Sequence, residues 1–402
     1  MYKAVTVILH WNTDYAEIPR AELPNVIKKS YTPTVQAFDG FEGTVCFNLT
    51  GHTTDYLLKQ APELIDQIKD FVKTGIVDPL ATGYSHPILP LLPQKRIRAQ
   101  LKTHIEQIDN LFGRKPQGAW PPELAISPLV LDEMSQLGIE WVTIDKEHLD
   151  LTQVYGNDIN LFERREPTVT EVLADAFWAK GTIDKIKKYR RALKKLNQEN
   201  SKLLSPLQRV FIQDDKNIRA FLSSQSWWNA TKIALAGDVP IYSEKKHFKA
   251  IMKSEAKYLP LYTSDVEFFG YRELGGKIPT PEKLVQFLNR LQKQEIVTVS
   301  PSEIPLEEWP SDSSFIGSGS WAPDKSLRLW SDSEDNRDFS RRMSEIYQTL
   351  DRLGWDNNLI SKLLPFLRII ENSDVHGWKP IPERKHEGYS ALLSIYKILD
   401  EK

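Results

Sequence analysis

Acidic residues stand where two apolar runs of this sequence end. The stretch LYTSDVEFFGYRE, residues 261–273, runs from strand-like apolar residues into Asp265 and Glu267, and Glu123 follows the segment GAWPP. In a strand, side chains at positions i and i+2 point the same way, which predicts that Asp265 and Glu267 share one face. The prolines before Glu123 cannot donate to a strand's hydrogen-bond ladder, so we expect the strand to end there and Glu123 to lie in the following turn.

Two carboxylates delivered by different strand ends can break a glycosidic bond. One acts as nucleophile and the other as proton donor, and in the retaining geometry the two carboxyl groups stand ~5 to 5.5 Å apart. The donor needs a raised pKa, which the apolar neighbours Phe268 and Phe269 would provide beside Asp265. The spacing alone leaves another interpretation open, because acids at strand ends also cap helices and form ion pairs.

The composition excludes several classes of protein. The 402 residues include 52 Lys and Arg against 54 Asp and Glu, so the net charge of −2 gives no basic excess and we expect no nucleic-acid partner. Cys46 is the only cysteine, which excludes an internal disulfide and a thiolate metal cluster. The opening MYKAVTVILHWN predicts a buried first strand rather than a signal peptide, and no segment has the ~20 apolar residues of a membrane span. We therefore expect a soluble cytoplasmic protein that does not bind membranes.

Short apolar runs alternate with amphipathic helical segments over the first three hundred residues. The segment PELIDQIKDFVKTG predicts a helix that ends at Gly75, and QKRIRAQLKTHIEQIDNLFG predicts one that ends at Gly113. In SPLVLDEMSQLG, Ser127 is expected to cap a helix that begins at Pro128. Repeated strand, helix and strand predict parallel pairing, in a β/α barrel or an open α/β sheet.

Two changes in texture divide the chain. The alternation breaks after about residue 160 at a highly charged helical segment, which predicts a helical insertion at about 165–260. Near residue 305 a Ser-, Pro- and Gly-rich segment, PSDSSFIGSGSWAPDKS, begins a different pattern. We expect a catalytic α/β domain over 1–305 and a mainly helical domain over 306–402 that contributes to the cleft.

The segments GAWPPELAIS and TSDVEFFGYR resemble the nucleophile and acid/base regions of glycoside hydrolase family 57, the family of α-amylases, 4-α-glucanotransferases and branching enzymes. LHWN, GYSHPILPLLP and ENSDVHGWKPIPERK resemble its other regions and occur in the same order. The resemblance implies an incomplete seven-stranded (β/α) barrel, an α-glucan or oligosaccharide substrate, a retaining mechanism and no cofactor. Whether the activity is hydrolysis or transfer stays open.

The same resemblance assigns roles to individual residues. Glu123 would be the nucleophile that forms a covalent glycosyl intermediate, and Asp265 would be the acid/base. Glu267 is expected to position the substrate, with the acid role as its alternative. The other predicted substrate-binding residues are His10, His86, Trp120, Trp321, Asp374 and Trp378. The two histidines are expected to donate hydrogen bonds to sugar hydroxyls, and the tryptophans either to stack on glucose rings or to pack between the domains.

One region departs from the family pattern. The chain reads His10, Trp11, Asn12 where family members commonly read His-Gln-Pro, so the contacts beside the donor sugar stay open. Two other functions remain as alternatives. One is a metal-dependent carbohydrate deacetylase or mannosidase-like enzyme with His10, Asp14 and His86 as ligands, and the other is a catalytically silent glycan-binding protein. We expect no metal, because no tight His-x-x-x-His or paired-Asp signature lies near the first strand.

Overall fold

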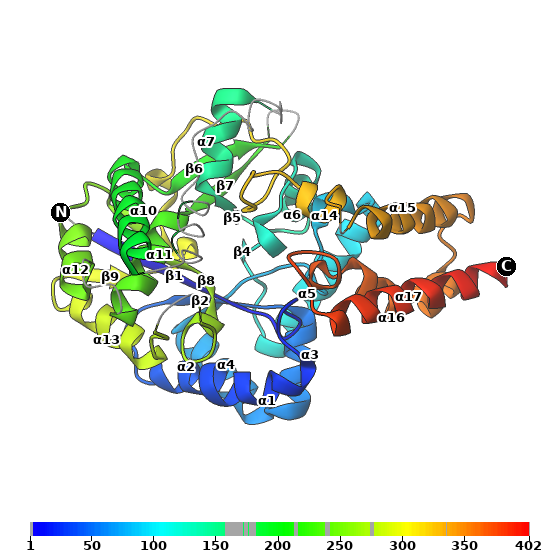
Figure 1. Ribbon diagram of the computed structural model, residues 1–402, viewed down its shortest axis with the longest axis horizontal. Helices are drawn as coiled ribbons and strands as arrows, with labels where there is room; N and C mark the ends of the chain where they lie inside the picture. The colour runs from blue at the N-terminus through cyan, green and yellow to red at the C-terminus, as the bar shows by residue number, and fades with distance from the viewer. Residues whose placement is uncertain are drawn as a thin grey trace.

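The protein is an α/β fold in which mainly parallel strands are surrounded by helices (Figure 1). The computed structural model describes residues 3–156, 172, 176, 182–212, 216–237, 242–273, 277–334 and 336–401. The strands are β1 (Lys3–Trp11), β2 (Val45–Leu49), β3 (Val77–Pro79), β4 (Gly118–Ala119), β5 (Trp141–Asp145), β6 (Leu207–Phe211), β7 (Asn217–Ser223), β8 (Tyr258–Asp265) and β9 (Ile296–Thr298).

The strands form two sheets that meet edge to edge. In the first, β1 pairs in parallel with β2, β8 and β9, and β2 pairs with β3. In the second, the order is β4-β5-β7-β6, and β6 is the one antiparallel strand among the described residues. A parallel bridge between Ala81 and Ala119 joins the sheets on one side. On the other side, Ser223 Oγ of β7 lies 2.8 Å from Thr263 Oγ1 of β8.

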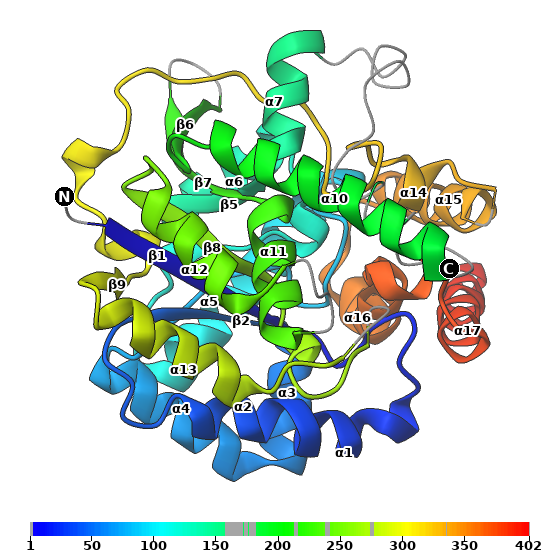
Figure 2. The ribbon, with the colours of Figure 1, turned by 60° about the vertical axis from the view of Figure 1, so that its left-hand side comes forward.

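The helices cover the strands. They are α1 (Leu23–Val26), α2 (Thr32–Ala37), α3 (Gly51–Gln60), α4 (Pro62–Thr74), α5 (Gln94–Phe112), α6 (Pro128–Gln136), α7 (Lys146–Tyr155), α10 (Thr182–Lys202), α11 (Gln225–Ala236), α12 (Glu244–Lys253), α13 (Pro281–Gln292), α14 (Arg328–Ser331), α15 (Arg337–Arg352), α16 (Asn357–Glu371) and α17 (Pro382–Asp400). Helices α2, α4 and α13 lie together on one side of β1 and β2 (Figure 2) and share a hydrophobic core with them. Every residue of β1 after Lys3 is buried, as expected of a strand covered on both faces.

Several predicted helix ends are confirmed. Helices α4 and α5 stop at Gly75 and Gly113, whose φ angles of +84° and +67° are left-handed and favour glycine. The Ser127 hydroxyl accepts a hydrogen bond from the Val130 backbone N–H and so caps α6.

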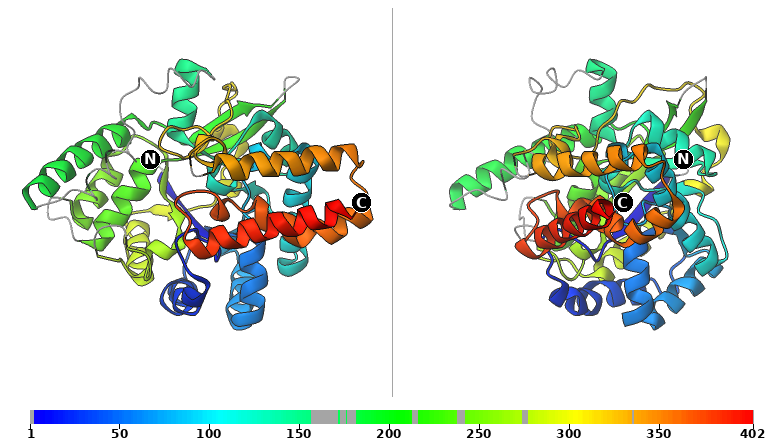
Figure 3. Two further views of the ribbon diagram at one scale, coloured as in Figure 1. Left: turned by 45° about the vertical axis from the view of Figure 1, so that its right-hand side comes forward. Right: turned by 90° about the vertical axis from the view of Figure 1, so that its right-hand side faces the viewer.

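The C-terminal helices share a hydrophobic cluster with α5 and with strands of the second sheet. Helices α15, α16 and α17 lie side by side (Figure 3). Leu363 and Ile395 of these helices belong to the same hydrophobic cluster as Ile97 of α5 and Ile144 of β5. This packing brings the turn after α16 to the carboxyl end of β1. None of the described helices is both long and apolar enough to cross a membrane.

One strand is shorter than its sequence pattern predicts. The segment EWVTIDKEHL predicts a strand, but β5 ends at Asp145, whose carboxylate accepts from the His148 backbone N–H at 2.8 Å and starts α7. β7 ends at Ser223, and α11 begins at Gln225. Within the predicted insertion at 165–260, β7 is a strand of the second sheet and α10 is a long helix. Positions 165–171, 173–175, 177–181, 213–215 and 238–241 of that insertion lie outside the described residues.

Candidate active site

Polar residues gather at the carboxyl ends of the strands, and His10 of β1 lies between a residue of β2 and a residue of β8. The register of β1 places His10 opposite Asn48 of β2 on one side and Asp265 of β8 on the other. Asn48 Nδ2 donates to two backbone carbonyls at 3.1 and 3.2 Å, which leaves its Oδ1 facing His10 Nδ1 at 2.7 Å. His10 Nδ1 must therefore carry the proton, and Nε2 is an acceptor.

The charge on His10 follows from its surroundings. Burial and the nearby His86 lower the pKa of His10 from 6.5 to about 3, so the ring is neutral. Its Nε2 is buried and makes no hydrogen bond within the described part of the chain. The family resemblance predicts that His10 donates to a sugar hydroxyl, whereas this tautomer offers a lone pair that accepts from one. Trp120 is buried and stacks on the ring, with 6.1 Å between centroids.

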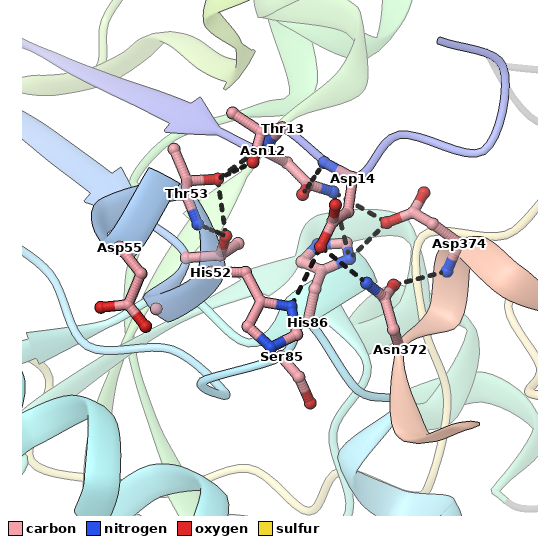
Figure 4. Close-up of polar contacts among 12 residues, drawn as sticks. Asn12, Thr13, Asp14, His52, Thr53, Asp55, Ser85, His86, Asn372 and Asp374 are labelled. Carbon is pink, nitrogen blue, oxygen red and sulfur yellow. Dashed lines mark hydrogen bonds and ion pairs between the residues drawn. The ribbon is translucent and has the colours of Figure 1, made fainter. Parts of the chain in front are cut away.

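The pKa of His86 shifts in the opposite direction. Its Nδ1 lies 3.2 Å from Asp374 Oδ2 (Figure 4). The same nitrogen lies 2.9 Å from Ser373 Oγ. Burial would lower the pKa of His86, but the bond to Asp374 and the charges of Asp374, Glu123 and Asp265 outweigh it and raise the pKa. His86 has a φ of +56°, a strained conformation for a side chain of its size. The His86 ring, whose positive form is favoured, thus stacks 5.0 Å from the neutral His10 ring.

Trp11 and Asn12, which depart from the family's His-Gln-Pro pattern, lie in different surroundings. Trp11 belongs to the core, and Asn12 belongs to the site. Trp11 is fully buried against Tyr31. Asn12 Nδ2 donates to Asp374 Oδ2 at 2.8 Å, and Asn12 Oδ1 accepts from the Asp14 backbone N–H at 2.9 Å. Asn12 therefore holds Asp374, the partner of His86, in place.

Asp14 is not placed with His10 and His86 as the metal hypothesis expected. It contacts His52 at 3.0 Å, Arg20 at 3.1 Å and Arg384 at 3.6 Å. The His52 bond and these positive charges outweigh burial and hold the pKa of Asp14 well below its usual range. Figure 4 shows Asp14 and His52 beside, rather than within, the contact between His86 and Asp374. Positive neighbours already neutralise Asp14, which disfavours a cation there.

Within the described residues, a different set of side chains comes within metal-binding range of one another. One ligand atom each from His86, Glu123 and Asp374 lies within 4.8 Å of the other two. A metal needs a lone pair on the imidazole nitrogen that it binds, whereas His86 Nδ1 faces the Asp374 carboxylate and the pKa of His86 is raised. These contacts fit a charged imidazole better than a metal ligand.

Glu123 lies in a strained turn beyond β4. Its φ of +56° and ψ of +21° are left-handed, a conformation that costs of order 1 kcal/mol and persists only where the surroundings fix it. The Trp321 indole N–H donates to Glu123 Oε2, and Ser373 Oγ lies 3.5 Å from Oε1. Burial is the main cause that raises the pKa of Glu123 from 4.5 to about 7, while His86 and the Trp321 bond oppose it.

Asp265 is the last residue of β8. Burial raises its pKa from 3.8 to about 6, against the opposing effects of Tyr15 and His86. Arg272 Nη1 donates to Asp265 Oδ2 at 2.8 Å, and Arg272 also pairs with Glu17. The site therefore contains two carboxyl groups whose pKa values lie near neutrality, a property that acid–base catalysts require.

Glu267 does not share a strand face with Asp265. β8 stops at Asp265, and Val266–Phe268 form a short 3-10 turn that directs Glu267 into the core. Glu267 is completely buried and accepts a hydrogen bond from the Tyr31 hydroxyl. Burial, followed by the charge of Asp265, raises its pKa well above 4.5, which favours the protonated form.

These contacts predict different results for two substitutions of Glu267. Glu267→Gln keeps an acceptor for Tyr31 in a neutral side chain, so activity within about tenfold of wild type and an unchanged melting temperature are expected. Glu267→Ala removes the acceptor of a buried hydroxyl and should cost about 2 kcal/mol or more. Thermal denaturation and initial rates of both variants check this. A Glu267→Gln protein that folds but loses all turnover would return the acid role to Glu267.

The aromatic residues are distributed between the site and its rim. Trp321 contacts both Glu123 and Trp378, whose ring centroid is 6.1 Å away. Trp378 is 44% exposed and leaves a flat face open to solvent, which suits stacking on a sugar.

Sequence reasoning missed several residues that complete the site. Arg272 belongs to the same TSDVEFFGYR segment as Asp265 and Glu267, so a basic residue at that place was a usable signal. Asn48 and Ser373 gave no such signal, because their contacts depend on pairing and packing between segments distant in sequence.

Comparisons with known proteins bear on the whole arrangement. Residues 1–308 match the family model described as glycosyl hydrolase family 57. The chain is 29% identical over 123 residues to an α-amylase of Dictyoglomus thermophilum and 22% identical over 121 residues to a 4-α-glucanotransferase of Thermococcus litoralis. Each match covers 30% of this chain but only 18% of the relative, so these alignments span about a fifth of the longer proteins.

Solved structures extend the similarity of fold over the whole chain. A branching enzyme from Pyrococcus horikoshii superposes with a TM-score of 0.69 at 15% identity, covering 99% of this chain and 90% of that one. The 4-α-glucanotransferase from Thermococcus litoralis superposes with a TM-score of 0.64 at 13% identity, covering 99% and 60%. At these identities the superpositions establish a shared fold.

Proposed function

This chain belongs to glycosyl hydrolase family 57, and on that premise we propose that it is a retaining hydrolase or transglycosylase acting on α-glucans, with Glu123 as nucleophile and Asp265 as acid/base. One observation carries the proposal. Glu123 and Asp265 are half-buried carboxyl groups with raised pKa values, and the charges of both favour the positive form of His86. Two such acids at one site can each carry or release a proton near neutral pH.

In the first step, the Glu123 carboxylate attacks the anomeric carbon while the bond to the leaving sugar breaks. The departing oxygen takes the proton of Asp265, and a covalent glycosyl ester forms on Glu123. In the second step, water or an acceptor hydroxyl gives its proton to Asp265 and attacks the same carbon, which releases Glu123. Because each step inverts the anomeric centre, the configuration is retained overall.

The surroundings of the two acids support these roles. The Trp321 indole N–H and the Ser373 hydroxyl donate to Glu123 and stabilise its carboxylate. In the free protein the pKa of Glu123 is raised to about 7 and that of Asp265 to about 6, so near neutral pH each residue is protonated part of the time. A bound glycosidic oxygen accepts a hydrogen bond only from protonated Asp265, which shifts the proton to that residue. Once Glu123 is an uncharged ester, the pKa of Asp265 falls and the residue becomes a base.

We propose that seven parallel strands, β1, β2, β3, β4, β5, β7 and β8, form an incomplete barrel around this site. The bridge between Ala81 and Ala119 supports a continuous edge from β3 to β4. Between β7 and β8 the described residues make a side-chain bond, from Ser223 to Thr263, in place of a hydrogen-bond ladder. An opening at that position fits a barrel that does not close.

Product analysis tests the proposed activity. The purified protein is incubated with maltooligosaccharides and soluble starch, with and without EDTA, and the products are separated by length. We expect shorter or redistributed oligosaccharides of retained anomeric configuration, and no effect of EDTA because the contact of His86 Nδ1 with the Asp374 carboxylate fits a hydrogen-bonded imidazole better than a metal ligand. If all products are shorter than the substrate, the activity is hydrolysis. If some products are longer than the substrate, the activity is transfer. No change in either substrate would contradict the α-glucan assignment, and loss of activity in EDTA would favour the metal-dependent alternative.

A further inference from the structure

Lys325 is a fully buried cation that the proposed chemistry does not use. Its Nζ lies 3.1 Å from Asp145 Oδ1 and 3.1 Å from Glu147 Oε2. Its φ of +60° is left-handed, which a lysine adopts only when its surroundings impose it. A buried charge is costly unless it is paired and hydrogen-bonded. These contacts satisfy that condition, but they leave open what the charge does for the protein.

Asp145 connects Lys325 to the strand ends. It is the last residue of β5, and its carboxylate also accepts from Gln225 Nε2 at 3.1 Å and from the His148 backbone N–H at 2.8 Å. Asp145 therefore ties the start of α7, the start of α11 and Lys325 to one point at the carboxyl edge of the second sheet.

The loop before Lys325 carries Trp321 and is fixed by the same groups. The Trp321 carbonyl accepts from Lys325 Nζ at 3.2 Å and from Gln225 Nε2 at 3.1 Å. The loop also closes on itself, because the Ser320 backbone N–H donates to the Lys325 carbonyl at 3.2 Å. The Trp321 carbonyl is thus held from the side of the sheet, within a loop that is closed by its own backbone.

On its other side the loop runs along the segment that bears the nucleophile. Gly319 and Ile126 exchange two backbone hydrogen bonds, of 2.9 and 3.1 Å. The Trp321 N–H donates to the Glu123 carbonyl at 3.2 Å, and the indole N–H donates to its carboxylate. A Cβ at Gly319 would lie 2.4 Å from both His148 Nε2 and the Lys325 carbonyl, so the loop has no room to shift.

We propose that Lys325 is a positioning residue that, through Asp145 and the Trp321 carbonyl, fixes the Trp321 indole N–H on the carboxylate of Glu123. The inference rests on the proposed role of Glu123 for its effect on turnover, but the position of the indole can be measured without substrate. Lys325 lies beyond residue 308, where the match to the family model ends.

The test compares Lys325→Met, which keeps length and removes charge, with Lys325→Arg, which restores it. Two readouts are used: steady-state kinetics on a maltooligosaccharide, and the indole ¹H–¹⁵N resonance of Trp321, assigned with Trp321→Phe. We expect Lys325→Met to shift the resonance and to lower kcat about tenfold to a hundredfold with KM nearly unchanged. Lys325→Arg should recover a substantial part of both. In a Trp321→Phe background, Lys325→Met should have little further effect on kcat, because both changes remove the same contact.

A matched control separates positioning from loss of a buried ion pair. Arg219 is buried and pairs with Glu140 near the amino ends of β5 and β7. The loop that bears Trp321 lies at the carboxyl ends of these strands. Arg219→Met should lower the melting temperature without moving the Trp321 resonance or kcat. If Lys325→Met does not fold, Gln225→Leu keeps the lysine, removes the neutral bonds from Gln225 to the same carbonyl and to Asp145, and should shift the resonance in the same direction.

Several outcomes would overturn the inference. An unmoved Trp321 resonance in folded Lys325→Met, or in folded Gln225→Leu if the lysine variant fails, means that the indole is held without these groups. Losses of kcat that multiply in the double variant mean that Lys325 acts independently of Trp321. If the wild type is inactive but the Trp321 resonance still shifts as expected in Lys325→Met, the proposed function is contradicted and the positioning role stands.

Discussion

Glu123→Gln is expected to lower kcat on maltooligosaccharides by about four orders of magnitude or more. The amide has nearly the shape of the carboxyl group and can accept from Trp321, but it cannot form the glycosyl ester. The loss should therefore appear in kcat with little change in KM. Quenched-flow and steady-state assays on wild type and variant measure it, and circular dichroism checks the fold.

The same variant makes a prediction about stability. The pKa of Glu123 is raised from 4.5 to about 7 in the folded protein, so the folded state binds more protons than the unfolded state between these values. The stabilising contribution is full below pH 4.5 and is lost as the pH rises through about 7. Residue 123 does not titrate in the Glu123→Gln variant, so the variant should be more stable than wild type at pH 8 and closer to it in stability at pH 5.

A Glu123→Gln variant that keeps a tenth of the wild-type activity would exclude Glu123 as the nucleophile.

Asp265→Asn is expected to lower kcat on maltooligosaccharides by about three orders of magnitude, because the leaving sugar oxygen then departs without a proton. An α-glucosyl fluoride needs no proton for departure, so formation of the glycosyl-enzyme from it should be nearly normal in the variant. The ratio of the two rates separates a proton donor from a residue that only shapes the site.

The pH profile gives an independent check on Asp265. Turnover requires one proton on the two acids, so kcat/KM of wild type should be bell-shaped with flanks near the two pKa values of about 6 and about 7. Asp265→Asn should lose the alkaline flank. Equal losses on the glucan and the fluoride, with the bell intact, would mean that another group, with Glu267 the first candidate, donates the proton.

Much of the scaffold was predictable because it depends on local patterns. Gly75, Gly113 and Ser127 end or cap helices where the sequence places them, and the strands that deliver His10 and Asp265 are continuous apolar runs. The motif around Asp265 also indicated membership of the family, and the match of residues 1–308 to the family model confirms it.

The strand ends were harder to predict, because capping changes the backbone direction within one residue. Asp145 stops β5 and starts α7, although Lys146–Leu149 continue the strand-like pattern. The turn after Asp265 similarly buries Glu267, so the argument from alternating side chains fails one residue beyond the strand.

Other site features depend on tertiary packing alone. The charge of His86 requires Asp374, which the C-terminal helices deliver from almost three hundred residues further along the chain. The tautomer of His10 is set by Asn48, and the contact of Trp321 with Glu123 depends on a lysine buried against Asp145. No sequence period records such contacts.

The central claim is that a sugar becomes covalently attached to Glu123, and trapping that ester tests it most directly. Wild type is incubated with 5-fluoro-α-glucosyl fluoride, whose fluorine at C5 slows the breakdown of the ester, and the protein is then digested and mapped by mass spectrometry. The account predicts one fluoroglucosyl group on the peptide containing Glu123, absent from Glu123→Gln and retained in Asp265→Asn. A label on Asp265 or on Glu267, or turnover of the fluoride with inverted configuration and no label, would contradict it.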